Sequence, residues 1–168
     1  MNLAEKILEA NDKWSSAEFP GPAPRPPARH LVVVTCMDSR IDVFEVIGLR
    51  NGEAHIIRNA GGIVTDDVQR SIALSQRSLG TVDVAVVQHT DCGMCGFDAD
   101  GFRAALLAET GEAPDWGIAG FDDVDTSVRQ QLETIEASPW LRHDGEVAGF
   151  VYDVDTGRLR LVDRIPPG

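Results

Sequence analysis

The chain has 168 residues, 43% hydrophobic and 25% charged, which is the composition of an ordinary globular protein with room for one core. Asp and Glu number 27 against 15 Lys and Arg, and the resulting formal net charge of −12 argues against nucleic acid or an anionic membrane surface as a partner. There is no apolar run of the roughly 18 residues that a membrane span needs, no apolar signal-peptide core and no disulfide framework, so we expect a cytoplasmic protein.

The N-terminal region reads as a helix followed by a connector. Leu3, Ile7 and Leu8 have near-helical spacing and predict a helix over residues 3–14. Residues 20–27 are rich in proline, which fixes φ and removes a hydrogen-bond donor, so this stretch predicts an extended connector. We therefore expect one domain over residues 1–168, with residues 1–28 as an arm that packs on its own domain or on a partner subunit.

From residue 31 onward, strand patterns alternate with helix patterns. The β-branched runs predict strands buried on both faces, and turn residues Asp155 to Gly157 predict a terminal hairpin. Asp66 and Gln69 resemble a capping box, and Gly48 and Gly80 are placed to end helices. Strands are predicted at 31–35, 54–58, 82–88, 147–154 and 158–162. Helices are predicted at 41–47, 66–79, 102–109 and 124–137.

This order of elements predicts an α/β fold. We expect a mainly parallel central sheet of order 2-1-3-4, with an antiparallel fifth edge strand and helices on both faces. In such a sheet the first and third strands are neighbours, and the chain leaves them towards opposite faces. Ligands bind at this switch point, beyond the carboxyl ends of the strands.

The chemically active side chains follow these two strands. Cys36, Asp38 and Arg40 follow the first strand, and His89 and Cys92 follow the third. Two thiolates and an imidazole are a natural zinc set, and three protein ligands with an open fourth position is the catalytic arrangement. Arg40 would hold the Asp38 carboxylate in a fixed fork close to the metal. Taken singly, each residue has a structural explanation; Asp38, for example, is a reasonable N-cap for a helix that starts near Ile41.

Cys95 leaves two further possibilities open. With Cys92 it forms a C-x-x-C spacing, which is compatible with a redox disulfide. It could also complete a closed, inert four-ligand zinc site, although packing or mild reactivity of this thiol, which we expect at a helix start, is favoured. A phosphatase-like cysteine mechanism is disfavoured, because only three residues separate Cys36 from Arg40.

Three segments together resemble the β-class carbonic anhydrases. Residues 36–40 (C-M-D-S-R) match the family's C-x-D-x-R motif, and residues 89–93 (H-T-D-C-G) match its H-x-x-C motif. Residues 58–62 (R-N-A-G-G) resemble the R-N-A-G segment that lies between them. The short chain resembles the compact prokaryotic branch of the family.

The resemblance implies a role for each residue. Cys36, His89 and Cys92 would bind one Zn²⁺ per chain, and zinc-bound hydroxide would convert carbon dioxide to bicarbonate and a proton. Asp38, oriented by Arg40, would accept a hydrogen bond from the hydroxide, or in a closed state would become the fourth zinc ligand. Family members form homodimers or larger homo-oligomers, often with a swapped N-terminal arm.

The resemblance also leaves questions open. The family's substrate-binding glutamine is absent before the first strand, so a backbone amide near Gly61 or Gly62 would have to form the substrate pocket. His30, His55 and His143 are candidate proton shuttles by residue type alone. The alternative functions are hydrolysis of carbonyl sulfide or carbon disulfide on the same scaffold, and a non-catalytic zinc-binding module.

Overall fold

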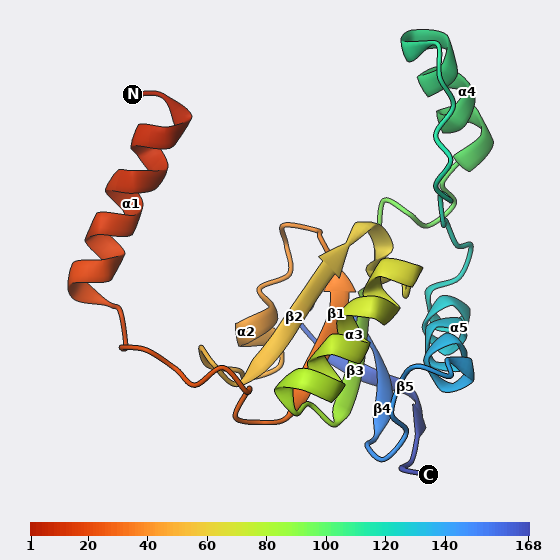
Figure 1. The fold of residues 1–168 in the computed structure, drawn as a ribbon. Helices are drawn as coiled ribbons and strands as arrows, with labels where there is room; N and C mark the ends of the chain where they lie inside the picture. The colour runs from red at the N-terminus through yellow and green to blue at the C-terminus, as the bar shows by residue number, and fades with distance from the viewer.

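The centre of the fold is a five-stranded sheet of order β2-β1-β3-β4-β5 (Figure 1). In the computed structural model, which describes residues 1–168, β1, β2, β3 and β4 run parallel and β5 pairs antiparallel with β4. The predicted fold class and strand order are therefore confirmed. The strands are β1 Leu31–Cys36, β2 Ala54–Asn59, β3 Asp83–His89, β4 Val147–Tyr152 and β5 Leu159–Ile165.

The helices agree with the predicted pattern, with changes at their ends. They are α1 Leu3–Ala17, α2 Val43–Val46, α3 Asp66–Leu79, α4 Ala99–Thr110 and α5 Val124–Ala137, with a single 3-10 turn, η1, at Ala60–Gly62. None of these helices is both long and apolar enough to cross a membrane.

One predicted helix start and one predicted cap were wrong: α2 begins at Val43 and not near Ile41, whereas α3 spans residues 66–79 as predicted but is capped differently. The N-cap of α2 is Asp42, whose side chain accepts from the Glu45 backbone N–H, so Asp38 caps no helix and is free for the site. The N-cap of α3 is Thr65, whose hydroxyl accepts from Val68 N–H, so the predicted Asp66–Gln69 capping box is not formed. Both errors arise because several neighbouring residue types can cap, and helical periodicity does not choose among them.

The main core lies between the sheet and the helices α3 and α5. β-Branched side chains of alternate strand positions pack against Ile72 of α3 and Leu132 and Ile135 of α5, all at most 2% exposed. The strand residues of this core are Val32, Val34, Val84, Val86 and Val147.

The opposite face of the sheet is only partly covered. Near β1, Ile41, Val43 and Leu49 of the α2 segment pack on Val33 and Val87. Beyond them an apolar groove of about 310 Å³ runs over β3, β4 and β5, so the expectation of helices on both faces holds only for part of the sheet. We call this the sheet groove; it is lined by Leu31, Ile47, Asp83, Val84, Ala85, Val87, Glu146, Ala148, Phe150 and Leu159.

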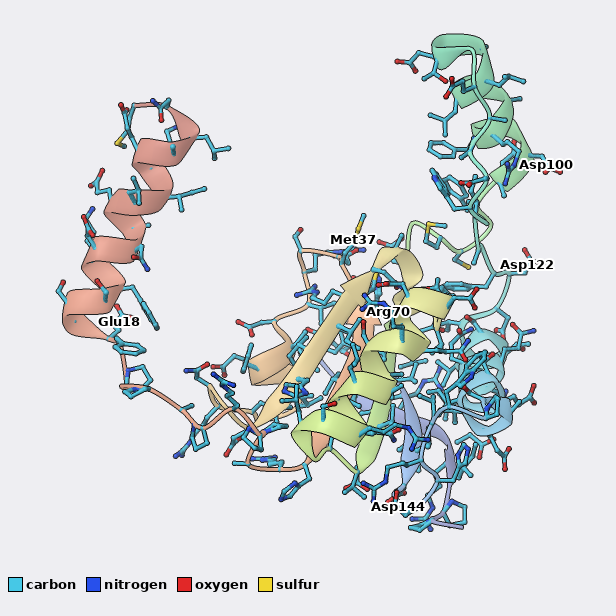
Figure 2. All side chains as sticks on the ribbon, viewed as in Figure 1. Glu18, Met37, Arg70, Asp100, Asp122 and Asp144 are labelled. Atoms are coloured by element: carbon cyan, nitrogen blue, oxygen red, sulfur yellow. The ribbon has the colours of Figure 1, made fainter.

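Two helices project from this body. α1 stands at the end of the extended connector, and α4 rises on a long excursion between β3 and α5 (Figure 1). Their side chains point outward around the whole helix (Figure 2), and neither helix has a buried residue. α1 nevertheless carries Leu3, Ile7, Leu8 and Trp14, which are 42–75% exposed. An apolar helix face left in water is costly, and such faces usually mark an interface.

Candidate functional site

The carboxyl ends of β1 and β3 bring Cys36, His89 and Cys92 together. The two sulfur atoms and a ring nitrogen of His89 all lie within 4.8 Å of one another, and the two sulfurs are 4.0 Å apart. Cys36 is the last residue of β1, His89 is the last residue of β3, and Cys92 lies in the loop that follows β3. All three residues are buried, with exposures of 4%, 1% and 7%.

His89 is oriented to use Nε2 as a ligand. Its Nδ1 lies 2.8 Å from the Thr90 carbonyl oxygen, which can only accept, so Nδ1 carries the proton and Nε2 keeps its lone pair. Nε2 is buried and has no hydrogen-bond partner in the chain. Because buried polar atoms are rarely left unpaired, this orphaned acceptor indicates that a group outside the chain completes the site.

The two thiols share their protons unequally. The hydrogen bond between the two sulfur atoms lowers the pKa of Cys36 and raises the pKa of Cys92, which is also raised by burial. Burial lowers the pKa of His89, but the negative charge on Cys36 outweighs burial and raises it. Without metal the cysteine pair therefore titrates as a unit that retains one proton, and a cation would displace that proton.

These donors fit zinc. Tetrahedral zinc with Zn–S bonds near 2.3 Å places two thiolates about 3.8 Å apart, close to the 4.0 Å found here. Cys95 is not part of the cluster: it is exposed, its backbone pairs with Phe121 in an isolated β-bridge, and its free thiol donates to the Asp122 carbonyl oxygen at 3.5 Å. The expectation that Cys95 starts a helix was wrong, because α4 begins at Ala99; Cys95 supplies neither a fourth ligand nor a disulfide partner for Cys92 in this structure.

Asp38 and Arg40 form a fixed fork beside this cluster. Arg40 Nε donates to Asp38 Oδ1 at 3.0 Å, and Arg40 Nη2 donates to Oδ2 at 2.7 Å. The Arg40 backbone N–H also donates to Oδ1, at 2.9 Å. These side-chain and backbone hydrogen bonds hold the pKa of the Asp38 carboxyl well below its usual range and raise the pKa of Arg40. Asp38 is therefore an ionised acceptor with a fixed orientation.

The fork is held at its other end by Asp91. Arg40 Nη1 donates to Asp91 Oδ2 at 2.7 Å, and Nη2 donates to the Asp91 carbonyl oxygen at 2.9 Å. Asp91 adopts a positive φ of 52°, which turns both acceptors towards Arg40. Asp91 lies within the H-T-D-C-G motif, but its contact with Arg40 was not predicted, because a residue pattern does not show this loop conformation.

Arg58 is a second residue to which the sequence analysis gave no role. Its guanidinium donates to three backbone carbonyls of the β1–α2 loop: Cys36 at 2.8 Å, Asp38 at 2.6 Å and Ile41 at 3.2 Å. This contact fixes the loop that carries Cys36, Asp38 and Arg40. Only its place in the R-N-A-G segment could have pointed to it.

Gly61 and Gly62 form a tight turn against the site. Both are buried and have positive φ, 83° and 63°, and the Asn59 side chain closes the turn through two hydrogen bonds to the Ile63 backbone. The Gly61 backbone N–H is near the Cys36 sulfur and is one of the groups that lower the pKa of this thiol. A Cβ on Gly62 would lie 3.0 Å from the Cys36 nitrogen, so the turn needs glycine there.

The three histidines considered as proton shuttles lie away from the site. His30 precedes β1 and His55 is near the start of β2, whereas the site is at the strands' carboxyl ends, roughly 20 Å along a six-residue strand. His143 precedes β4 and bonds the Ser138 carbonyl oxygen. None of these histidines is placed to pass protons directly to the cluster.

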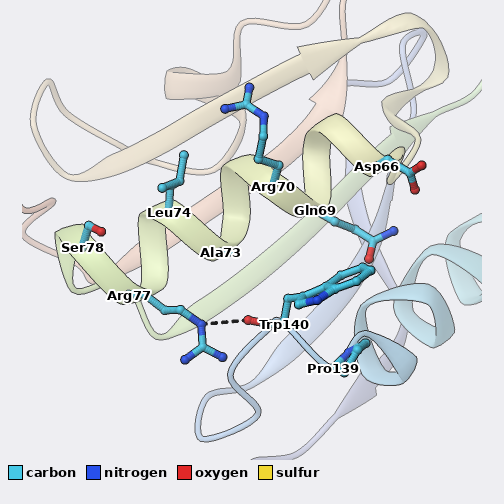
Figure 3. Close-up of a pocket in the computed structure, with 9 residues that line it drawn as sticks. All are labelled: Asp66, Gln69, Arg70, Ala73, Leu74, Arg77, Ser78, Pro139 and Trp140. Atoms are coloured by element: carbon cyan, nitrogen blue, oxygen red, sulfur yellow. Dashed lines mark hydrogen bonds between the residues drawn. The ribbon is translucent and has the colours of Figure 1, made fainter.

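Two grooves lie elsewhere on the surface. An apolar groove of about 360 Å³ borders the loop after Cys92, where Met94 packs on Gly61. A wider groove of about 750 Å³ lies between α3 and Trp140, whose carbonyl oxygen accepts from Arg77 (Figure 3). The wider groove contains none of the three clustered residues and is not the site described above.

Comparison with known proteins agrees with this geometry. The family model described as carbonic anhydrase matches residues 31–159. Beta-carbonic anhydrase 1 of Mycobacterium tuberculosis is 46% identical over 162 residues, covering 96% of this chain and 99% of the relative. A carbonic anhydrase structure from Streptococcus mutans superposes with a TM-score of 0.90 at 38% identity, covering 97% of this chain and 99% of that one. A carbon disulfide hydrolase of Acidithiobacillus thiooxidans is 30% identical, covering 93% of this chain and 87% of the relative.

Proposed function

Because the chain belongs to the carbonic anhydrase family, we propose that it is a zinc enzyme that reversibly hydrates carbon dioxide to bicarbonate and a proton. The observation that carries this proposal is the buried Cys36–His89–Cys92 cluster, with its unpaired His89 Nε2, beside an ionised and oriented carboxylate. Zinc held by these three residues would supply a water of lowered pKa and hence a nucleophile near neutral pH.

The chain's own residues would orient that nucleophile. Asp38 Oδ2 lies 3.8 Å from His89 Nε2, so it would be placed to accept a hydrogen bond from a water in the fourth ligand position. An ionised Asp38 can only accept, so it would direct the remaining lone pair of that oxygen towards the substrate carbon. Arg40 and Asp91 would keep the carboxylate in this orientation and away from the fourth ligand position.

The apolar groove beside Met94 supports a small, uncharged substrate. It is lined by Asn59, Ala60, Ile63, Thr65, Met94, Phe97, Phe102, Trp116, Gly117, Ile118 and Ala119. We propose that carbon dioxide reaches the site along it and past the Gly61–Gly62 turn, against which the lining residue Met94 packs. The released proton would pass to solvent buffer, since His30, His55 and His143 lie near the other end of the sheet.

We also propose a homodimer in which α1 of each chain lies on the sheet groove of its partner. Leu3, Ile7 and Trp14 form one apolar stripe of α1, and the groove is an apolar surface that no helix of its own chain covers. Lys6 and Lys13 flank this stripe, each one residue before a stripe residue, and Asp83 and Glu146 line the groove. The apolar character of both surfaces and the opposite charges beside them therefore favour the same occupant of the sheet groove, α1 of the partner chain.

A cytoplasmic location is part of the proposal. The three free thiols include two that must stay reduced to bind metal, which a reducing compartment ensures.

The test is a side-by-side kinetic comparison of substrates. Zinc-quantified protein is assayed by stopped flow for hydration of carbon dioxide and, separately, for sulfide release from carbonyl sulfide and carbon disulfide. We expect rapid hydration and little sulfide release. Sulfide release that is faster than hydration would instead assign the chain to the sulfur-substrate hydrolases, and zinc binding without any turnover would identify a non-catalytic module.

A further inference from the structure

Gln88 is a buried polar residue for which the catalytic proposal has no use. It precedes His89 in β3 and is 0% exposed, among side chains that are otherwise mostly apolar. Its amide nitrogen, Nε2, donates to the Gly61 carbonyl oxygen at 2.8 Å and lies 3.4 Å from the Gly62 carbonyl oxygen. Its Oε1 atom is buried and has no partner in the chain.

This half-paired carboxamide is unfavourable for stability alone. A buried acceptor without a hydrogen bond destabilises a fold, and an apolar side chain of similar size would avoid that loss. Buried polar groups of this kind need a specific reason. The donor end of Gln88 points to that reason, because it contacts the turn that packs on Cys36.

The turn connects Gln88 to the metal ligands. Gly61 accepts from Gln88 through its carbonyl oxygen. The next residue, Gly62, packs so tightly on β1 that an added Cβ would lie 3.0 Å from both the Cys36 nitrogen and the Thr35 carbonyl carbon. A shift of this turn would therefore move both Cys36 and the Gly61 N–H, which is one of the groups that lower the pKa of the Cys36 thiol.

We propose that Gln88 is a positioning residue of the metal centre, which holds the Gly61–Gly62 turn so that the Gly61 amide faces the Cys36 sulfur. The inference rests on the proposed metal centre at Cys36, His89 and Cys92. An amide N–H on a thiolate withdraws charge from it, so Gln88 acts through Gly61 on how strongly Cys36 donates to the metal. The unpaired Oε1 destabilises the core, but a carboxamide at this position also provides the donor that contacts the turn.

The test uses Gln88→Met, which keeps an unbranched side chain of similar length but removes the donor. Gln76 offers a matched control: it is also buried, at 1% exposed, and its carboxamide makes two hydrogen bonds to the Arg142 backbone, far along the sequence from the metal ligands. Both variants and the wild type are loaded with Co²⁺. The readouts are the sulfur-to-cobalt absorption band and the metal affinity measured against a chelator.

We expect Gln88→Met to shift the absorption band and to weaken metal binding by about 10-fold or more, as loss of a residue that orients a ligand does elsewhere. Gln76→Met should lower thermal stability and leave both readouts unchanged. Gln88→His supplies a ring N–H of similar reach and should restore the band towards its wild-type position. If Gln88→Met does not fold, Gln88→Asn, which withdraws the amide by one methylene, carries the same prediction.

The outcomes separate the two proposals. Wild-type affinity and an unshifted band in folded Gln88→Met or Gln88→Asn would overturn the positioning role and leave the metal centre intact. A wild-type protein that binds neither Co²⁺ nor Zn²⁺ would overturn the metal centre itself, and the role of Gln88 with it.

Discussion

Asp38 Oδ2 lies 3.8 Å from His89 Nε2, the buried ring nitrogen that has no partner within the chain. Asp38 lies in the loop after β1, and His89 is the last residue of β3, the neighbouring parallel strand. The separation is too long for a direct hydrogen bond and leaves space beside the carboxylate for a third group. This arrangement supports the proposal that metal binding and orientation of the nucleophile belong to adjacent but different side chains.

Because Arg40 holds both carboxylate oxygens of Asp38, we expect Arg40→Lys to reduce catalytic activity. A lysine is a single point charge and cannot hold both carboxylate oxygens and Asp91 together. We expect kcat/KM for carbon dioxide hydration to fall about 10- to 100-fold with zinc content unchanged. The pKa of Asp38 would rise towards its ordinary value, still well below neutral, so at pH 7 the loss would reflect orientation and not protonation.

Arg70→Lys is the control for that substitution. Arg70 also binds an aspartate through Nε and Nη2, but on the exposed surface of α3. The Arg70→Lys variant should keep wild-type kcat/KM. Equal effects of the two substitutions on kcat/KM would mean that the Asp38–Arg40 fork has no special role.

Alanine substitutions at Gly62 and at Gly48 should differ in their effect on stability, although the two glycines have the same φ. Gly62 and Gly48 both have φ of 63°, but a Cβ on Gly62 would press on the Cys36 backbone, whereas a Cβ on Gly48 meets nothing within 4 Å. Gly48→Ala should lower the free energy of unfolding by about 1–2 kcal/mol, the cost of left-handed backbone. Gly62→Ala should lower it by clearly more and also reduce zinc affinity.

Urea denaturation of the metal-free proteins and chelator competition measure these two effects. If both alanine variants lose the same stability and bind zinc equally well, the close approach of Gly62 to Cys36 has no energetic importance.

The shared proton of the cysteine pair predicts proton release on metal binding. The lowered pKa of Cys36 favours its thiolate, whereas Cys92 has a raised pKa and must lose its proton to bind zinc. Zinc binding should therefore release about one proton from this pair, and affinity should rise with pH. Calorimetric titration in buffers of different ionisation enthalpy counts the protons. Binding that is independent of pH between 6 and 8 would argue against thiolate ligation by Cys92.

The exposed stripe of α1 predicts the oligomeric state. Ile7→Asp combined with Trp14→Asp places two charges on the face that we expect to lie on the partner's sheet groove. The wild type should be a dimer by light scattering, and the double variant should be a monomer. Leu74→Asp changes a comparably exposed apolar side chain on α3 and should leave the dimer intact. A dimer that survives the double substitution would exclude α1 as its main contact.

Much of this fold could be predicted because two of its strands, β1 and β3, are nearly continuous runs of apolar, mostly β-branched residues. The β-branched runs at β1 and β3 have no alternation, which predicts burial on both sides and a parallel sheet. The element order then placed Cys36 and His89 on neighbouring strands. The uncovered part of the sheet was not predicted, because a strand pattern records that a face is apolar and not what covers it.

The supporting contacts of the site could not be predicted for a different reason. Asp91 reaches Arg40 through a left-handed backbone, and Arg58 contacts carbonyl groups that any sequence would present. Cys95 is turned away by pairing with Phe121, a residue of the α4–α5 connection. These relationships depend on loop conformation, for which residue type and spacing carry little information.

In the proposed mechanism Asp38 orients the nucleophile while Cys36, His89 and Cys92 hold the metal. Asp38→Asn tests it most directly, because the amide keeps the shape but replaces one acceptor oxygen by a donor. Stopped-flow hydration and zinc content are measured together, with Asp67→Asn, on the exposed surface of α3, as the control. We expect Asp38→Asn to keep one zinc per chain and to lose about 100-fold or more in kcat/KM. Wild-type kcat/KM in a zinc-loaded Asp38→Asn variant would contradict the account.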